Sequence, residues 1–498
     1  MEYIATFDVG TTAVKGVLVD LEGHAAASQS IDIPTIAENG HQEQDPRVWW
    51  EAFKAISRTF TQAVPAADIT GISMSGQMQD LILLDTDLQP VGNAILYSDG
   101  RAVEEAQALE AVYGTDRFLA VIGNRCDGSL PLPKLMWVKQ HCPDLYGKAA
   151  HLLISSKDYL TARLAGVCCG DVTACATAGA MDIRKKCWDA GLLAAAGVSP
   201  ALFPALHASH DRVGAVLDAP ALECGYRPGT PVFAGVGDAG ATTLASGIAG
   251  PGQYNINLGT SGWVATVSGA PLTTDTGVFN LAATTADRYI NVVPFLNAGN
   301  VHRWISGVFS GPAAQATGGI DYAAMSALLA ESEPGSHGAV FLPYLVGERF
   351  PVLDPDIRGG YVGLTPQTSA ADLARACLEG VAFSIRQGLE QLGTRPTAIS
   401  LIGGGGRERV WCQILADVLG QEVAVFRDAE LLPSLAVAST ALLGKGVISS
   451  YEQFTQPLLE GDSCVRYAPR QAHRQLYNGL YERYSRLYPA LKSLFEVR

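Results

Sequence analysis

The chain lacks the patterns that mark membrane, secreted and nucleic-acid-binding proteins. No apolar run reaches the roughly 18 residues that a membrane-spanning helix needs. The first residues do not combine a basic segment, an apolar segment and a cleavage site, so we expect no signal peptide. The sequence has no long run rich in lysine and arginine, and the net charge is −14. This balance argues against nucleic acid or a membrane as partner, and we expect a cytoplasmic protein.

Two kinds of local site are also missing. The ten cysteines include no Cys-x-x-Cys pair of the kind that binds metals, and they are too sparse for a disulfide framework. We expect reduced and mostly buried thiols. No Gly-Lys-Ser or Gly-Lys-Thr is present, so the chain has no Walker A loop. Any phosphate chemistry must therefore rest on another motif.

The length and composition indicate a folded protein with more than one domain. A chain of 498 residues is too long for one hydrophobic core. Hydrophobic residues make up 48% and charged residues 17%, which is typical of globular rather than disordered chains. A Gly-Pro-Gly turn lies near the midpoint. We predict domains at residues 1–249 and 250–498.

One short phrase occurs twice, half the chain apart. Tyr3–Asp20 reads YIATFDVGTTAVKGVLVD, and Gln253–Val267 reads QYNINLGTSGWVATV. Each predicts two strands joined by a tight turn, which is a β-hairpin. Glycine followed by two hydroxyl residues offers N–H and O–H groups to an anion. The candidate residues for clamping a polyphosphate from both sides are Gly10, Thr11 and Thr12 in the first turn and Gly259, Thr260 and Ser261 in the second.

The remaining pattern predicts an α/β fold. Asp45 is a typical N-cap, and Pro46 suits the first position of a helix that should run to about Gln62. Long helices are predicted over Ala370–Leu392 and, with small residues, over Pro433–Gly444. Strands alternate with these helices, so we expect one sheet in each half, covered on both faces. The tail from Tyr451 should be an amphipathic helix on the surface.

Two aspartates are candidates for the chemistry. Asp8 ends the first strand beside the first turn, where a carboxylate typically holds Mg²⁺; capping of the turn is the simpler alternative. Asp238 lies in GVGDAGA, between a strand and a small-residue helix. Helix-start N–H groups favour its anionic form, which suits a base for phosphoryl transfer, and a plain N-cap is equally compatible. The neighbouring glycines should let another molecule approach the backbone.

A run of four glycines, Gly403, Gly404, Gly405 and Gly406, follows a buried strand. It is a candidate for receiving a nucleotide against the backbone. The strand, the glycines, the helix and Asp428 also imitate a dinucleotide fingerprint, but Glu408 stands where the third glycine would be. An NAD-dependent oxidoreductase is therefore disfavoured.

Two loops in the first half follow predicted strands and carry polar groups suited to a polyhydroxylated substrate. They are MSGQMQD, Met74–Asp80, and YSDGRA, Tyr97–Ala102. Ligands of α/β proteins bind where strands end. An ordinary loop, with Asp99 merely paired to Arg101, is the alternative. The candidate substrate-binding residues are Gln77, Met78, Gln79, Asp99 and Arg101.

Taken together, these phrases resemble the FGGY carbohydrate kinases, a branch of the actin-like ATPase superfamily, and within it the xylulokinases. The likeness covers nearly the whole chain in one order. It includes FDVGTT, HQEQDPRVWW, SGQM, SDGRA, LPKLMWVKQHCPDLY, SKDYLTARLAG, GVGDAGA, NLGTSG, FLPYLVGER, LEGVAFSIRQGLE and IGGGGRERVWCQILADVLG. Each phrase is moderately specific, and the ordered set is very specific.

The resemblance implies two actin-like, ribonuclease H-like ATPase domains with ATP and sugar in the cleft between them. Asp238 matches the general base on the sugar hydroxyl. Asp8 and Asp238 are the implied Mg²⁺ ligands, and Lys15 joins the first turn in facing the phosphates. The second turn faces the phosphates from the other domain, and Gly403–Gly406 lie at the adenosine.

The chain departs from xylulokinases near the sugar. Gln79 stands where histidine is usual, and Ala239 stands where asparagine is usual. Tyr97-Ser98 replace Trp-Asn before the Asp-Gly-Arg of the second loop. The catalytic and phosphate motifs are intact. D-xylulose is therefore the leading candidate among several substrates.

The sequence thus predicts ATP-dependent phosphorylation of a terminal hydroxyl of a ketopentose, with ATP and Mg²⁺. A kinase for another ketose or a polyol, such as ribulose, ribitol or erythritol, is the first alternative. A non-catalytic actin-like sugar sensor is the second, and the intact Asp8 and Asp238 argue against it. The expected partners are the sugar and ATP alone, and a homodimer is left open.

Overall fold

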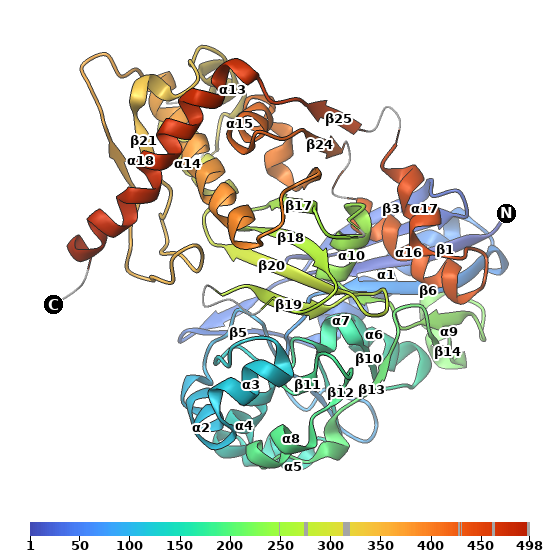
Figure 1. The fold of residues 1–498 in the computed structure, drawn as a ribbon. Helices are drawn as coiled ribbons and strands as arrows, with labels where there is room; N and C mark the ends of the chain where they lie inside the picture. Colours follow the sequence, from blue (N-terminus) through green and yellow to red (C-terminus); the bar gives the residue numbers. More distant parts are fainter. Residues whose placement is uncertain are drawn as a thin grey trace.

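Two seven-stranded sheets, one in each half of the chain, form the framework of the protein (Figure 1). The computed structural model describes residues 1–248, 250–272, 277–311, 319–426, 429, 431–460 and 464–495. The strands of the first sheet are β1 (Tyr3–Val9), β2 (Ala13–Asp20), β3 (Ala25–Asp32), β6 (Ile69–Gly76), β14 (Arg212–Ala215), β15 (Pro231–Phe233) and β16 (Val236–Gly237). Those of the second are β17 (Gln253–Leu258), β18 (Gly262–Ser268), β19 (Phe279–Ala282), β20 (Tyr289–Phe295), β23 (Ala398–Ile402), β24 (Val423–Phe426) and β25 (Cys464–Tyr467).

Helices and short strands cover these sheets. The helices are α1 (Pro46–Ala63), α2 (Val103–Tyr113), α3 (Thr115–Ile122), α4 (Pro131–His141), α5 (Pro143–Lys148), α6 (Ser156–Ala165), α7 (Val172–Cys175), α8 (Ala190–Ala196), α9 (Asp218–Cys224), α10 (Asp238–Ala245), α11 (Gly299–Phe309), α13 (Tyr322–Ala330), α14 (Ala370–Gln391), α15 (Arg409–Leu419), α16 (Leu432–Gly444), α17 (Tyr451–Leu458) and α18 (Arg474–Leu491). The short strands are β4 (Ile36–Glu38), β5 (His41–Gln44), β7 (Ile82–Leu84), β8 (Ala94–Ile95), β9 (His151–Leu153), β10 (Cys169–Asp171), β11 (Met181–Asp182), β12 (Cys187–Trp188), β13 (Ala205–His207), β21 (Val340–Leu342) and β22 (Gly360–Val362).

The two sheets share one topology at their centres. The first has the order β14-β15-β6-β1-β2-β3, with β16 also paired to β6, and the second has the order β19-β20-β18-β17-β23-β24-β25. In each, a central strand pairs antiparallel with the next strand and parallel with a later one: β1 with β2 and β6, and β17 with β18 and β23. Both predicted hairpins and the two-sheet α/β fold are confirmed.

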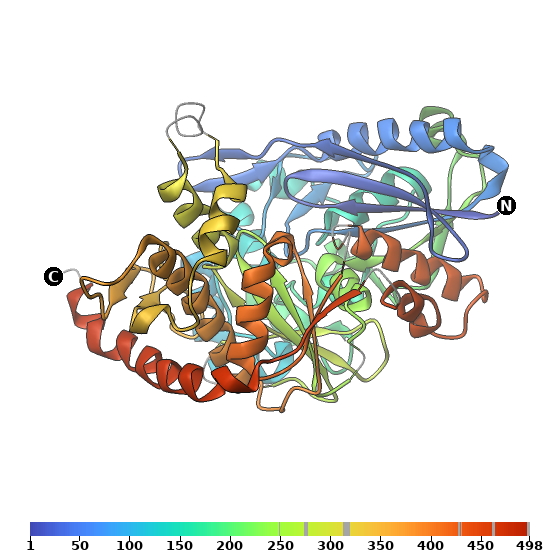
Figure 2. The same ribbon diagram turned by 90° about the horizontal axis from the view of Figure 1, so that it is seen from above.

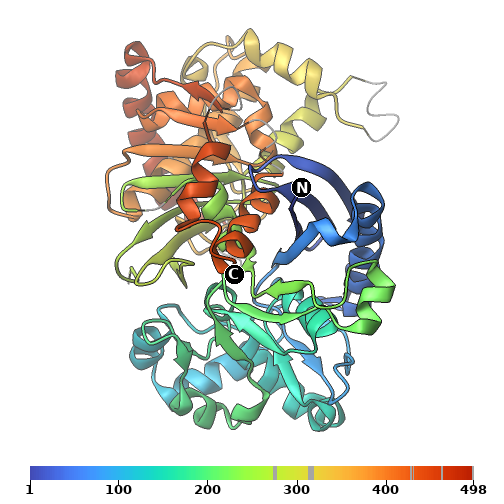
Figure 3. The same ribbon diagram turned by 90° about the vertical axis from the view of Figure 1, so that its right-hand side faces the viewer.

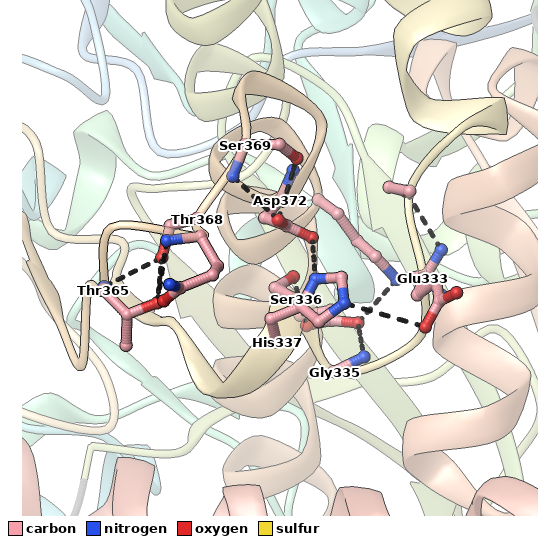
Figure 4. A network of polar contacts seen from close by, with 12 residues as sticks. Glu333, Gly335, Ser336, His337, Thr365, Thr368, Ser369 and Asp372 are labelled. Atoms are coloured by element: carbon pink, nitrogen blue, oxygen red, sulfur yellow. Dashed lines mark hydrogen bonds and ion pairs between the residues drawn. The ribbon is translucent and has the colours of Figure 1, made fainter.

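The start of α14 shows how a predicted helix is capped (Figure 4). Ser369 accepts a hydrogen bond from the backbone N–H of Asp372, and the Asp372 carboxylate accepts one from the N–H of Ser369. This reciprocal capping satisfies backbone donors that the first helical turn leaves free. The His337 ring contacts the same carboxylate at 2.9 Å. The prediction of a long helix here is confirmed.

Helices from the second half also cover the first sheet. In Figures 1 and 3, α16 lies beside the strands of the first half and α10. Ala441 and Leu442 share a buried apolar cluster with Phe233, and the hydroxyls of Thr440 and Ser73 lie 2.6 Å apart. The small residues of α16 permit this close packing, and a Cβ on Gly444 at its end would lie 2.6 Å from the Phe233 ring. The two halves are therefore joined through α10 and α16 as well as through the connecting chain.

The carboxy-terminal tail differs from the single surface helix that its pattern predicts. Its first helix, α17, packs on α16, and Tyr451 is buried with its hydroxyl 2.9 Å from the His210 ring. β25 then adds an edge strand to the second sheet. Only α18 follows the prediction, and it lies along the outside of the second half (Figure 2). Its own Tyr477 and Tyr484 are buried. Tertiary packing divides the tail into three elements.

Two further observations concern the whole chain. No helix within the described ranges has the length and apolar character needed to span a bilayer. All ten cysteines are free, and five of them are buried.

Candidate active site

The first turn lies where three adjacent strands end. Asp8 on β1 is opposite Lys15 on β2 and beside Ser75 on β6. The Ser75 hydroxyl donates to Oδ1 of Asp8 at 2.8 Å. Burial raises the pKa of Asp8, and the Ser75 hydrogen bond and the Lys15 charge oppose that shift. Asp8 lies two residues before Gly10, whose N–H closes the turn on the Ala13 carbonyl at 3.1 Å.

The amide side chains of Gln77 and Gln44 hold the first turn in place. The Thr11 hydroxyl donates to Oε1 of Gln77 at 2.8 Å, and Nε2 of Gln77 donates to Gln44 at 2.9 Å. Gln44 completes a ring by donating to the Thr11 carbonyl at 2.6 Å. Gln77 was predicted to bind substrate, and its side chain is buried. It belongs to the loop Met74–Asp80 and connects that loop to the first turn through Thr11. The hydroxyl-bearing Thr12 is exposed at the tip.

Asp238 begins α10 directly after β16, which pairs with the carboxyl end of β6. Its Oδ1 accepts the backbone N–H of Ala239 at 2.7 Å. Burial raises the pKa of Asp238 to about 7, with a further contribution from the negative charge of Asp8. A carboxylate with a pKa near neutrality matches the requirement for a general base. The structure brings the two predicted acids to neighbouring strand ends.

The glycines around Asp238 have a different role from the one predicted. Gly235 has a φ of +68°, and a Cβ there would lie 2.0 Å from the Met74 carbonyl oxygen. A Cβ on Gly237 would lie 2.0 Å from the sulfur of Met78. The missing side chains therefore admit neighbouring parts of this chain, and Met78 packs against the turn that leads to Asp238. The expectation that these glycines open the backbone to a ligand does not match this packing.

A buried charge cluster behind Asp238 was not predicted. Nζ of Lys157 lies 2.5 Å from Asp158 and 2.9 Å from Asp171, and it donates to the carbonyl of Ala234 at 3.1 Å. Ala234 precedes the glycine turn that leads to Asp238, so the lysine anchors that turn. The two aspartates raise the pKa of Lys157, although burial opposes them. The sequence signal for this cluster was the adjacent pair Lys157 and Asp158 in a segment that folds as the buried helix α6.

The second predicted sugar loop is organised by an ion pair. The Arg101 guanidinium binds both oxygens of Asp99, at 2.9 and 2.6 Å, and also Glu43 at 2.7 Å. Burial raises the pKa of Asp99, but the hydrogen bonds from Arg101 outweigh it, and the pKa is lowered. The guanidinium also lies 5.0 Å from the centre of the Trp137 ring. The pairing of Asp99 with Arg101, the alternative to direct substrate binding, is therefore present.

Gln79 lies at the end of the first sugar loop in an uncommon conformation. Its φ is +67°, which non-glycine residues rarely adopt. Its Nε2 donates to the Ser129 hydroxyl at 2.6 Å. Gln79 and Ala239 are both half-buried.

The second turn is held by backbone rather than by side chains. Gly259 and Thr260 offer their carbonyls to the N–H groups of Gly299 and Asn300, at 2.8 and 2.9 Å. These donors belong to the first turn of α11. The side chains of Thr260 and Ser261 are exposed. The hydroxyls thus remain free for a ligand, as the predicted role requires.

The glycine run packs against the same edge of the second sheet. Gly403 has a φ of +101°, and a Cβ there would lie 2.6 Å from the Leu258 carbonyl oxygen. Leu258 immediately precedes the second turn, so the run and the turn are adjacent. Gly404–Arg407 form a short 3₁₀ turn, and Gly403 and Gly406 line a pocket of about 790 Å³. Asp428, part of the rejected dinucleotide pattern, lies outside the described residues.

Asp8 and Asp238 are the predicted Mg²⁺ ligands. Within the described residues no three histidine, cysteine or acidic side chains are grouped as a metal site. Asp8 nevertheless raises the pKa of Asp238, which indicates two carboxylates close enough to repel each other. Mg²⁺ is commonly held by one or two carboxylates plus substrate phosphates, and the repulsion of such a pair is relieved by a cation. The donor set fits Mg²⁺ bound together with a nucleotide.

Comparison with known proteins gives consistent matches along the whole chain. The model of the FGGY family of carbohydrate kinases, N-terminal domain, matches residues 3–245, and the C-terminal domain model matches residues 254–433. The xylulose kinase of Bacillus subtilis is 31% identical over 505 residues, covering 99% of this chain and 98% of that protein. The gluconokinase of the same organism is 27% identical over 486 residues, covering 96% and 94%. The solved structure of xylulose kinase from Rhodospirillum rubrum superposes with a TM-score of 0.90 at 28% identity, covering 100% of both chains.

Proposed function

The chain belongs to the FGGY family of carbohydrate kinases, and on that premise we propose that it phosphorylates the terminal hydroxyl of a ketopentose. D-xylulose, converted to D-xylulose 5-phosphate, is the leading substrate. The xylulose kinases among its relatives support this choice. The observation that carries the proposal is Asp238, a half-buried carboxylate whose pKa is raised to about 7 beside Asp8 and the first turn.

Asp238 acts as the general base in this proposal. The sugar hydroxyl oxygen bonds to the γ-phosphorus of ATP while the bond from that phosphorus to the β–γ bridging oxygen breaks. ADP leaves, and the hydroxyl proton passes to an Asp238 carboxylate oxygen. A base with a pKa near the working pH combines a large ionised fraction with useful proton affinity. Lys157, through Ala234, holds the turn that aims this carboxylate.

The two turns bind the phosphates. Thr12 of the first turn and Thr260 and Ser261 of the second offer backbone N–H and hydroxyl groups to anionic oxygens, while Gly10 closes the first turn without a side chain in the way. Lys15, opposite Asp8, adds a positive charge on the first side. Phosphoryl transfer depends mainly on such positioning and charge neutralisation.

Asp8 and Asp238 would hold Mg²⁺, which neutralises charge on the phosphate oxygens during transfer. Gly403–Gly406 would receive the adenosine, since Gly404 has no neighbouring atom within 4 Å of the position a Cβ would take. A nucleotide can approach the backbone closely at such a position.

A kinase for another ketose or a pentitol is the second candidate. Gln79 donates to Ser129 from a left-handed backbone, and Ala239 offers no polar side chain next to the base. A sugar site that differs in one buried polar group discriminates strongly against the wrong hydroxyl pattern. The preferred sugar therefore depends on these two positions.

One experiment tests kinase, substrate and metal together. ADP release is measured with D-xylulose, ribulose, ribitol, erythritol and gluconate, each with and without Mg²⁺. We expect sugar-dependent and Mg²⁺-dependent release that is strongest with a ketopentose. Sugar binding without any ADP release would favour the sensor, and strongest release with gluconate would reject a ketopentose as the substrate.

A further inference from the structure

Two buried charges hold together the two loops that carry the predicted sugar-binding groups. Residues 77–80 follow β6, and residues 97–101 follow β8. Lys134, on α4, and Asp80, at the end of the first loop, are both 0% exposed. Neither is among the candidate substrate-binding residues that the sequence predicts, and neither takes part in the proposed transfer.

Lys134 connects the loops through its ammonium group. Nζ donates to the carbonyl oxygen of Gln79 at 3.2 Å and to that of Leu96 at 2.6 Å. The first carbonyl lies in the first loop, and the second lies one residue before the other loop. A single side chain therefore sets the spacing between them.

Asp80 makes a second cross-connection between the same loops. Its Oδ1 accepts the backbone N–H of Tyr97 at 3.1 Å, and its own N–H donates to the Ile154 carbonyl at 3.0 Å. Burial raises the pKa of Asp80 and lowers that of Lys134 to about 8, while the attraction between the two groups opposes both shifts. The pair stabilises each partner in the interior.

Gln79 is the residue that this arrangement constrains most. Its backbone carbonyl is held by Lys134, and its side chain by Ser129, two residues before α4 begins. Its φ of +67° is disfavoured for a residue with a Cβ. A strained backbone of this kind persists where surrounding contacts determine it. The direction of the Gln79 amide is therefore imposed by α4 and the segment before it.

A buried ammonium is a costly way to pack two loops if stability alone is needed. Replacing buried charges with apolar residues of similar size is often neutral or stabilising. Hydrogen bonds from one Nζ to two carbonyls instead fix the position of one loop relative to the other. Positioning of this kind is what recognition of sugar hydroxyls requires.

We propose that Lys134 is a positioning residue for sugar selection, with Asp80 as its supporting partner. Lys134 holds Gln79 and the second loop at the spacing that fits the substrate, without contacting the substrate itself. This inference rests on the proposed function, because it concerns the same sugar site.

The test compares Lys134→Met with Lys134→Arg. A misplacement of about 1 Å in a binding group costs on the order of a hundredfold. We therefore expect Lys134→Met to raise KM for the preferred sugar about tenfold to a hundredfold, with KM for ATP unchanged. The margin between that sugar and the other sugars should also shrink. Lys134→Arg keeps a cation that can reach carbonyls and should recover part of the loss.

Arg375→Met is the matched control. It breaks the buried Arg375–Glu379 pair, whose Nε and Oε1 lie 2.7 Å apart on α14 in the other half. Thermal unfolding should show a loss of stability in both Met variants. Only Lys134→Met should change the sugar KM and the sugar preference.

The possible outcomes separate this inference from the proposed function. Unchanged sugar KM and preference in folded Lys134→Met, or equal losses for sugar and ATP, would overturn it. If Lys134→Met does not fold, Ser129→Ala and Asp80→Asn carry the same measurement, and unchanged sugar preference in both would overturn it. A wild type inactive with every sugar would instead reject the proposed function, and sugar affinities from calorimetry would then decide the role of Lys134.

Discussion

The two turns of the repeated phrase occupy equivalent places on two similar sheets, yet only one carries charge. In the first hairpin, Asp8 is paired across the strands with Lys15. In the second, Asn257 takes the place of Asp8 and is paired with Trp263. The acid and the cation of the first turn have neutral counterparts in the second.

The two turns also differ in how they are held. Buried amides, Gln77 and Gln44, brace the first turn through side-chain hydrogen bonds. Backbone N–H groups of Gly299 and Asn300 hold the second. The repeated framework thus offers two candidate places for phosphate, and the charged candidates Asp8 and Lys15 lie only in the first. We expect changes in the first half to alter turnover and changes in the second half to alter nucleotide binding.

The largest expected effect is that of Asp238→Asn. Loss of a general base typically lowers kcat by about a hundredfold to ten-thousandfold. Asparagine keeps the size of the side chain and can still accept the Ala239 N–H, so ATP and sugar should still bind. Single-turnover kinetics and calorimetry check both points. Turnover within a few-fold of wild type would show that another group removes the proton.

Exchanging the equivalent residues Asp8 and Asn257 tests directly whether the two turns have different roles. Asp8→Asn should raise the Mg²⁺ concentration needed for half-maximal activity about tenfold to a hundredfold, as expected for loss of a group that orients a bound metal. Asn257→Asp places a carboxylate where ATP phosphates are expected and should raise KM for ATP by repulsion. Mg²⁺ titrations of both variants measure the first effect, and ATP titrations measure the second. Identical responses of the two variants would contradict the division of roles.

Gln79 and Ala239, which differ from the residues usual in xylulokinases, should control the choice of sugar. Gln79→His with Ala239→Asn should move preference toward D-xylulose by about tenfold to a hundredfold, because a buried hydroxyl gains or loses a polar partner worth about 1–3 kcal/mol. The measurement is kcat/KM for each sugar in both proteins. A strong D-xylulose preference in the wild type that the double change leaves intact would exclude these positions as determinants.

Activity should fall in acid because the base must be ionised. The pKa of Asp238 is raised to about 7, so kcat/KM should be roughly halved near that pH and should fall about tenfold per unit below it. A nearby cation favours the carboxylate, and the decline should move to lower pH as Mg²⁺ increases. The pH profile of kcat/KM at two Mg²⁺ concentrations checks this. A profile flat from pH 5 to 8 would contradict it.

The smallest expected effect concerns two neighbouring glycines of the second half. Gly403→Ala puts a Cβ 2.6 Å from the Leu258 carbonyl at a φ of +101°, and such strain costs about 1–3 kcal/mol. Gly404→Ala meets no atom within 4 Å and is the matched control for folding. The first should lower the unfolding midpoint, whereas the second should raise KM for ATP if the nucleotide approaches there. Unfolding curves and ATP titrations distinguish the two.

Much of the fold was predictable because its signals are local. The N-cap at Asp45 and the proline after it predicted α1, and alternating apolar residues around a Gly-Thr turn predicted both hairpins. The tail was less predictable. An amphipathic pattern specifies an apolar face but not the surface that will cover it. In the folded chain, α17 packs against α16.

The amino-acid sequence by itself determined the two repeated hairpins, the family, and Asp8 and Asp238 as candidates for the chemistry. The hairpins and the two aspartates each lie in a contiguous stretch of residues, and the family follows from the order of such stretches along the chain. Only the tertiary structure decided that Gln77 braces a turn, that Gly237 makes room for Met78, and that Lys134 joins two loops. These roles arise from contacts between segments far apart in the chain, where burial and hydrogen-bond partners exist only after folding.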